Sequence, residues 1–138
     1  MITVAEVKEL AHEFWEIVKS GAHGSAAEHM FINPGLLLPT GEWMDLESHQ
    51  AMHRALCDES HNWIELDVTP LPSDGLERVV ARGTVHWEAS LANGKPGRVI
   101  SDVAETWVIE RGEDGKLRWT LYWSDSLSLA PESVAFEP

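Results

Sequence analysis

The sequence has few basic residues. Ten Lys and Arg stand against 23 Asp and Glu, which gives a formal net charge of −13. Such an excess of negative charge repels the phosphates of nucleic acids and anionic lipid surfaces. We therefore expect neither a nucleic acid nor a membrane among the partners, and solubility is the simplest role for the charge.

Cysteine and long apolar runs are also scarce. The single cysteine, Cys57, excludes an intrachain disulfide and fits a reducing compartment. Cys57 falls late in a predicted helix, where we expect a small buried side chain rather than a nucleophile. The first residues lack the basic and apolar regions of a secretory signal, and no apolar run is long enough to span a bilayer. We expect a cytoplasmic protein.

Several motifs that carry chemistry are missing. The sequence contains no Gly-x-Ser-x-Gly elbow, no Gly-rich phosphate loop and no Asp-x-Asp calcium loop. We therefore expect no cofactor. His49 and His53 are four residues apart on one predicted helix face and have the spacing of a metal chelate, but no third ligand motif accompanies them. We predict no metal, and interpret the two histidines as buried hydrogen-bonded or pocket-lining groups.

Three helices are predicted in the first part of the chain. Thr3 and Glu6 have the spacing of a capping box, and the apolar residues that follow recur on one helical face until Ser20-Gly21. A short second helix opens at Ser25 and is stopped by Asn33-Pro34-Gly35. A third helix is capped by Asp45 and runs to about Cys57.

The second part of the chain has the alternating pattern of strands. A brief apolar run at 36–38 predicts a short buried strand, and four long strands follow at 61–69, 79–89, 99–109 and 117–126. Asp114-Gly115 supplies the tight turn of the last hairpin. Helices followed by an antiparallel meander predict one α+β domain over 1–138, with its core at about 3–129 and a loose acidic tail at 130–138.

A family resemblance rests on three segments: Glu105-Thr-Trp107, Asp114-Gly-Lys-Leu117 and Trp119-Thr-Leu-Tyr-Trp-Ser-Asp125. With the order of helices and strands, they make the chain similar to the nuclear transport factor 2-like superfamily, and most of all to its SnoaL-like branch. The resemblance implies a cone-shaped, strongly curved antiparallel sheet wrapped by three N-terminal helices. It also implies an internal pocket and a homodimer through the outer sheet face. Members include ketosteroid isomerases, polyketide cyclases, dehydratases and non-catalytic binders.

The resemblance also suggests site residues. Phe14 stands where the isomerases have a tyrosine, and no carboxylate lies near Leu38-Pro39, where they have their base. These departures argue against ketosteroid-isomerase chemistry. Glu105 corresponds to a buried acid on the third long strand, and Asp125 resembles an aspartate of the polyketide cyclases.

Alternation along the last strand predicts which side chains face the pocket. The odd residues from Leu117 to Asp125 include Trp119 and Trp123, so we expect this face to be buried and Asp125 to end it at the pocket rim. The ligand-binding residues that we predict are largely aromatic: Phe14, Trp15, His49, His53, Trp87, Trp107 and Trp123. The alternative role for these tryptophans is core and dimer packing.

The resulting hypothesis is a pocket for a small apolar or polycyclic ligand, with Glu105 and Asp125 as acid–base groups. Burial raises the pKa of a carboxyl group because the charged form loses solvation, and this suits a general acid or base near neutral pH. The protein would then be a cofactor-independent cyclase, dehydratase or isomerase. The alternatives are a Glu105 that only pairs with an Arg or His, an Asp125 that is a solvated strand-end residue, and a non-catalytic dimerisation or protein-interaction module.

Overall fold

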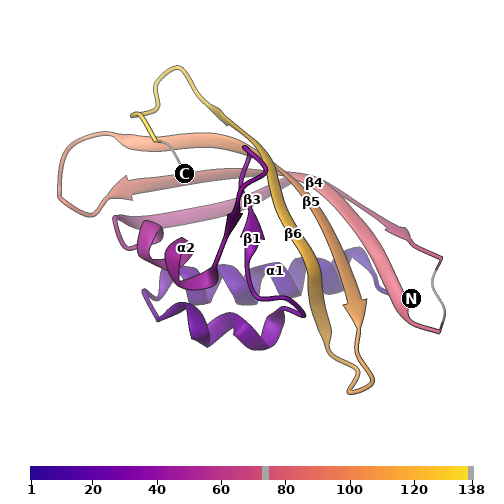
Figure 1. Ribbon diagram of the computed structural model, residues 1–138. Helices are drawn as coiled ribbons and strands as arrows, with labels where there is room; N and C mark the ends of the chain where they lie inside the picture. The colour runs from indigo at the N-terminus through magenta and orange to yellow at the C-terminus, as the bar shows by residue number, and fades with distance from the viewer. Residues whose placement is uncertain (73–74, 137–138) are drawn as a thin grey trace.

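The computed structural model describes residues 1–72 and 75–136, and in them three helices and six strands form an α+β fold (Figure 1). The helices are α1 (Val4–Lys19), the 3-10 helix η1 (Gly24–Met30) and α2 (Leu46–His53). The strands are β1 (Leu36–Leu37), β2 (Trp43–Met44), β3 (Leu56–Pro70), β4 (Glu77–Leu91), β5 (Arg98–Arg111) and β6 (Leu117–Leu129).

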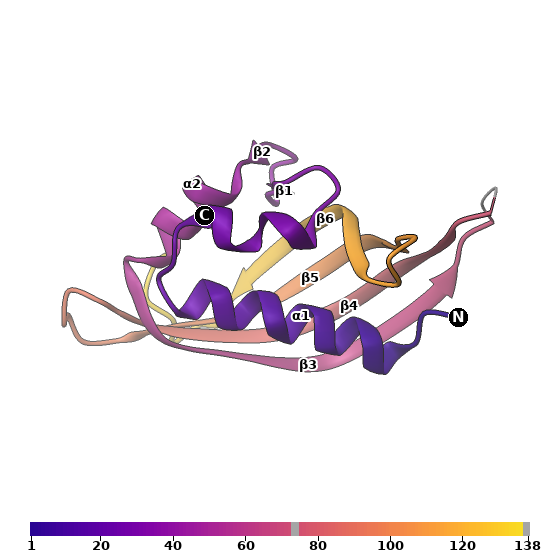
Figure 2. The ribbon, with the colours of Figure 1, turned by 90° about the horizontal axis from the view of Figure 1, so that it is seen from below.

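The strands form one sheet in the order β2-β1-β6-β5-β4-β3. The four long strands pair antiparallel in sequence order, as predicted. The sheet is nevertheless mixed, because β1 pairs parallel with β6 and antiparallel with β2. The long strands curve, and all three helices lie on the same side of them (Figures 1 and 2).

The first helix forms as its sequence predicts. The Thr3 hydroxyl accepts a hydrogen bond from the backbone N–H of Glu6, and the Glu6 carboxylate accepts one from the backbone N–H of Thr3. This capping box satisfies two amides that the first helical turn leaves free. The apolar stripe of α1, which includes Phe14 and Trp15, is buried against the sheet.

The main core lies between the helices and the concave face of the sheet. Trp107 on β5 and Trp119 on β6 are completely buried there. A second, smaller apolar cluster surrounds Trp87 on β4, and Val134 and Phe136 from the end of the chain cover it. Figure 2 shows α1 lying along β3 and β4.

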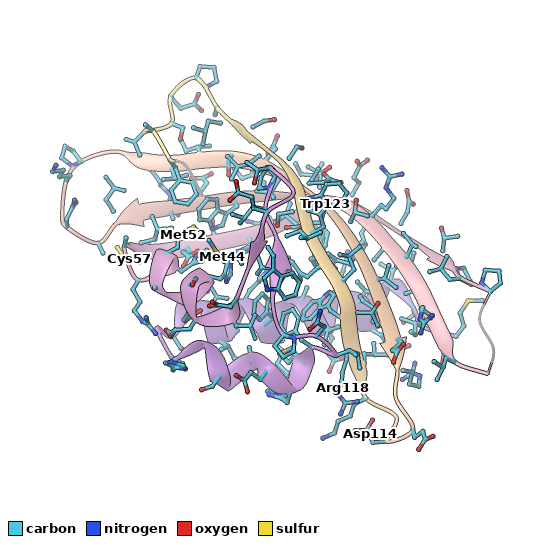
Figure 3. The ribbon with its side chains drawn as sticks, in the orientation of Figure 1. Met44, Met52, Cys57, Asp114, Arg118 and Trp123 are labelled. Carbon is cyan, nitrogen blue, oxygen red and sulfur yellow. The ribbon has the colours of Figure 1, made fainter. Side chains whose placement is uncertain are left out.

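The predicted second helix is present as a 3-10 helix. Two predictions about local structure are wrong. The third helix ends at His53, earlier than predicted, because the chain turns and enters β3 at Leu56. Cys57 therefore lies in a strand, where its side chain is exposed (Figure 3). Of the tail that we predicted at 130–138, residues 130–136 are described, and there the amides of Ala130 and Val134 donate to the carbonyls of Ile100 and Arg98.

Among the described residues, four β-bulges interrupt the ladders, two of them on β3 and two on β6. The bulges on β3 fall at Asp58–Glu59 and at Ile64, and those on β6 fall at Thr120 and Asp125. A bulge places one extra residue in a strand and so changes the face to which the following side chains point. These bulges decide which polar residues reach the interior.

Among the described residues, no helix is both long and apolar enough to cross a membrane.

Candidate functional site

A cavity of about 80 Å³ lies between α2, the concave face of the sheet and the C-terminal segment. Its wall is mostly aromatic and aliphatic, with a small number of polar groups, as is usual for a site that binds a small molecule. Its lining residues are Trp15, Val18, Leu36, Leu38, Pro39, His49, Met52, His53, His61, Val85, Trp87, Val103, Glu105, Tyr122, Ser124, Leu127 and Phe136. Met52, on α2, is labelled in Figure 3.

Glu105 is the carboxyl group on the β5 side of the cavity. The side chain of Glu105 is buried, and the residue is only 6% exposed. The Ser124 hydroxyl lies 3.0 Å from Oε2 and 3.1 Å from Oε1, and the Trp107 indole N–H donates to Oε2 over 3.1 Å. No Lys, Arg or His in the described residues forms an ion pair with Glu105, so its charge has no nearby partner.

The pKa of Glu105 is raised to about 8. Burial is the main cause, and the negative charge of Asp125 adds to it. The hydrogen bonds from Ser124 and Trp107 act in the other direction, because they stabilise the carboxylate. Glu105 is therefore mainly a neutral carboxylic acid at pH 7 and has a proton to donate.

A second polar cluster comes from α2 and β3. His53 Nδ1 lies 2.7 Å from Glu59 Oε1, and His53 Nε2 lies 3.1 Å from His49 Nε2. The Trp87 indole N–H donates to the same Glu59 oxygen over 3.0 Å. Burial raises the pKa of Glu59, but the hydrogen bonds and charge of His53 and the bond from Trp87 outweigh it, so the net shift is downward. Glu59 is thus a buried carboxylate that faces an imidazole.

Two aromatic residues complete the polar part of the wall. His61 stacks on Trp15 with ring centroids 4.4 Å apart, and burial lowers the pKa of His61 to about 4, so its imidazole is neutral at pH 7. The Trp15 indole N–H donates to the Tyr122 hydroxyl over 3.3 Å. Burial, together with the charge of Glu105, raises the pKa of Tyr122 well above its ordinary value. Tyr122 is therefore a neutral hydroxyl in the wall.

Five of the predicted site residues line the cavity. They come from four different elements: Trp15 from α1, His49 and His53 from α2, Trp87 from β4 and Glu105 from β5. They lie far apart in the sequence, and the wrapping of the sheet around α1 and α2 brings them together.

Four predicted residues lie elsewhere. Phe14 packs behind the wall with its ring stacked on His49, and Trp107 is fully buried beneath Tyr122. Trp123 donates its indole N–H to the Leu38 carbonyl and so holds β6 against the segment after β1.

Asp125 bonds to Thr106 and lies on the outer face of the sheet, opposite the helices. The predicted burial of the odd residues of β6 therefore holds for Trp119 and is wrong beyond it. Thr120 is an extra residue in the ladder, so Tyr122 and Ser124 take the inward positions.

The sequence interpretation missed four residues of the site: Glu59, His61, Tyr122 and Ser124. Glu59 is turned inward by the bulge at Asp58, and the other three depend on the register of β3 and β6. The sequence does contain one indication of this polar cluster: His53, Glu59 and His61 lie within nine consecutive residues.

The histidines do not form a complete metal centre. No group of three or more His, Cys, Asp or Glu side chains in residues 1–72 and 75–136 is arranged to hold a metal ion. His49 and His53 supply two nitrogens, and the nearest carboxylate, that of Glu59, is engaged by His53 Nδ1.

Comparisons with known proteins identify the fold. An NTF2-like protein from Cytophaga hutchinsonii superposes with a TM-score of 0.62 at 9% identity, covering 94% of this chain and 100% of that one. A proposed aromatic ring hydroxylase from Novosphingobium aromaticivorans gives 0.63 at 15% identity, covering 90% of each chain. The Kfla4162 protein from Kribbella flavida gives 0.63 at 20% identity, covering 91% of this chain and 89% of that one.

No protein-family model and no curated protein matches the sequence. The chain therefore has the NTF2-like fold, an α+β fold with three helices and a six-stranded mixed sheet among the described residues. Identities of this size show the fold alone, and function has to be argued from the site.

Proposed function

We propose that this protein binds a small molecule in its cavity and acts on it as a cofactor-independent acid–base enzyme of the SnoaL-like kind. The observation that carries the proposal is Glu105: a buried carboxyl group without a cationic partner, on the wall of a cavity, with a pKa of about 8. Keeping a carboxyl group in this state is costly, and such groups are concentrated at functional sites.

A neutral Glu105 is a general acid. Its proton can be given to a hydroxyl that leaves as water or to a carbonyl oxygen that becomes an enol, which are steps of dehydratases and isomerases. Tyr122 lines the same wall, and its oxygen accepts from Trp15, so the Tyr122 O–H is free to donate as well. Two donors on one wall favour a substrate that presents an oxygen acceptor.

The size of the cavity favours a small substrate. Its volume of about 80 Å³ is roughly half that of an engineered apolar cavity that holds benzene. Pockets for drug-sized ligands are several times larger. Of the two ligand classes predicted from the sequence, the small apolar one fits the described cavity and a polycyclic one does not.

A proton-exchange assay with two simple ketones tests this function. Acetone and cyclopentanone are incubated with the protein in D₂O, and incorporation of deuterium beside the carbonyl is followed by proton NMR. We expect the protein to accelerate the exchange, and Glu105→Gln to lower the rate at least ~100-fold, since general acid–base groups typically contribute ~10²–10⁴-fold. Glu113→Gln, in the exposed turn between β5 and β6, is the matched control. Equal rates with and without protein would refute the proposal.

An interaction role is the second proposed function, and a row of side chains on the outer face of the sheet supports it. Val80, Val108 and Leu121 are directly paired across β4, β5 and β6, and each is only partly buried. An apolar row of this kind suits a homodimer contact. We expect sedimentation velocity to find a dimer at micromolar concentration and Val108→Glu to weaken it. A monomeric wild type would exclude this role.

A further inference from the structure

The cavity has a polar chain that the Glu105 mechanism does not use. It runs from Trp87 through Glu59 and His53 to His49, with contacts of 3.0, 2.7 and 3.1 Å. His53 and Glu59 are 9% and 7% exposed. Three members of the chain, Trp87, His53 and His49, line the cavity, so this buried chain ends at the space where a substrate would lie.

The hydrogen bonds fix the positions of the protons in the chain. Glu59 is a carboxylate and accepts, so His53 Nδ1 carries a proton. A neutral His53 then has only a lone pair on Nε2, and the bond to His49 requires that His49 Nε2 donates. This leaves the lone pair of the His49 ring on Nδ1, which is buried and has no hydrogen-bond partner in the described residues. When both rings are neutral, the lone pair on His49 Nδ1 can therefore accept a proton.

We propose that the His49–His53 pair, positioned by Glu59, is the proton acceptor of this cavity, with Glu105 as the proton donor. The proposal deepens the proposed function, on which it rests. It gives the site both a base and an acid, and it assigns the substrate class: a small carbonyl compound with a hydrogen on the carbon beside the carbonyl.

The reaction balances without a redox partner. The bond between hydrogen and the carbon beside the carbonyl breaks, and its electron pair forms the carbon–carbon double bond of the enol. The proton goes to the histidine pair, while the carbonyl oxygen takes the proton of Glu105. The reverse steps return a proton to carbon and restore both groups. No metal, oxidant or reductant is consumed.

Charge supports the assignment. Burial, together with the charge that a protonated His53 would place beside it, lowers the pKa of His49 well below its ordinary value, so the His49 ring is neutral at pH 7. When the pair takes up a proton, the carboxylate of Glu59 lies 2.7 Å from His53 and compensates the new charge. The other titratable groups around the cavity are His61, Glu105, Tyr122 and, through its effect on His61, Lys19.

The exchange assay with acetone, the smaller of the two ketones, tests the pair. We expect His49→Gln and His53→Gln each to lower the exchange rate ~100-fold or more, with the exposed His12→Gln unchanged as the control. Glu59→Gln should lower the rate and also move the acidic limb of the pH–rate profile to lower pH, because an uncharged partner stabilises the imidazolium less. A merely structural Glu59 would lower the rate without moving the limb.

The outcomes separate the two proposals. If Glu105→Gln abolishes exchange while both histidine variants keep the wild-type rate and pH profile, the assignment of the His49–His53 pair as proton acceptor is wrong. The proposed function still holds in that case. If the wild type exchanges neither ketone, the proposed function itself fails. Should a histidine variant not fold, ¹⁵N NMR of the wild type decides: we expect Nδ1 protonated on His53 and bare on His49. A protonated Nδ1 on His49 in the neutral pair would overturn the inference.

Discussion

At the scale of single residues, the acid of the proposed chemistry is Glu105, a buried carboxyl group whose pKa is raised to about 8. Among the described residues, its carboxyl group accepts hydrogen bonds from Ser124 and Trp107, and the other side chains that line this wall are apolar or aromatic. Charging Glu105 therefore costs free energy in the folded protein that it does not cost in the unfolded chain. Protonation of Glu105 therefore affects both the stability of the folded protein and the proposed acid–base chemistry.

Substitution of Glu105 by Gln should make the protein more stable, and increasingly so with pH. The folded pKa of about 8 lies above the ordinary 4.5, so the wild type loses stability as pH rises from about 4.5 to 8 and stays level above that. The full difference is on the order of 5 kcal/mol. We expect urea unfolding of Glu105→Gln and wild type to give similar free energies at pH 4.5 and clearly different ones at pH 8.5. A constant difference would contradict the linkage.

Substitutions of Ser124 and Asp125, the two neighbours of Glu105, should shift the pKa of Glu105 in opposite directions. Ser124→Ala removes a hydrogen bond to the carboxylate, so the pKa of Glu105 should rise further. Asp125→Asn removes a negative charge, so the pKa should fall. NMR titration of ¹³C-labelled Glu side chains in both variants measures the two shifts, and shifts of the same sign would refute this account of the site.

At the scale of the elements, the β-bulges determine which side chains of β3 and β6 face the cavity. The bulge at Asp58 turns Glu59 toward His53, and the one at Thr120 turns Tyr122 and Ser124 inward. The bulge at Asp125 leaves that side chain outside while Ser124 stays opposite Glu105. Each bulge adds one residue to a ladder, and it changes the local chemistry because neighbouring side chains in a strand face opposite sides.

Asp58 holds its bulge in a left-handed backbone conformation, with φ of 49°. Such a conformation costs a residue with a Cβ about 1 kcal/mol relative to glycine. We expect Asp58→Gly to leave the protein as stable as the wild type or up to ~1 kcal/mol more stable, and Asp58→Val to destabilise it, as measured by thermal unfolding. Equal stability of the two variants would show that this backbone position is not constrained.

The bulges also explain what the sequence could not predict. The capping box of α1 and the order of the long strands follow from local patterns of residue type. The inward position of Glu105 followed from the family resemblance, because strand 99–109 is apolar on both faces. No comparable pattern of residue types marks the position of a β-bulge in the sequence. Simple alternation therefore assigned Trp123 and Asp125 to the interior in place of Tyr122 and Ser124. The chain from Glu59 to His49 joins a strand to a helix, so it was visible only once both were placed.

At the scale of the whole molecule, the C-terminal segment closes the cavity. The backbone amide of Ile100 donates to the Ser133 hydroxyl, and that of Val134 donates to the Arg98 carbonyl, so the segment runs beside the start of β5. Phe136 then packs edge-on against Trp87 at 5.2 Å and forms part of the cavity wall. The helices cover one part of the sheet, and this segment covers the part that they leave open.

Truncation after Ala130 should open the cavity to water. The Trp87 indole N–H, which donates to Glu59, would lose the cover of Phe136 and exchange its hydrogen faster. The Trp107 indole N–H, which donates to Glu105 beneath α1, is the internal control and should keep its rate. Hydrogen exchange of the indole signals by NMR measures both. Unchanged exchange at Trp87 would show that the segment does not close the site.

The proposed chemistry requires a cavity that keeps a carboxyl group neutral at physiological pH. The most direct test is to follow the ¹³C signal of the Glu105 carboxyl carbon from pH 3 to pH 10, with Glu105→Gln used to assign it. The account predicts a titration midpoint near 8. A midpoint near the ordinary value of 4.5 would mean that Glu105 is charged at pH 7. Glu105 would then have no proton to donate, and this result would contradict the proposed acid–base chemistry.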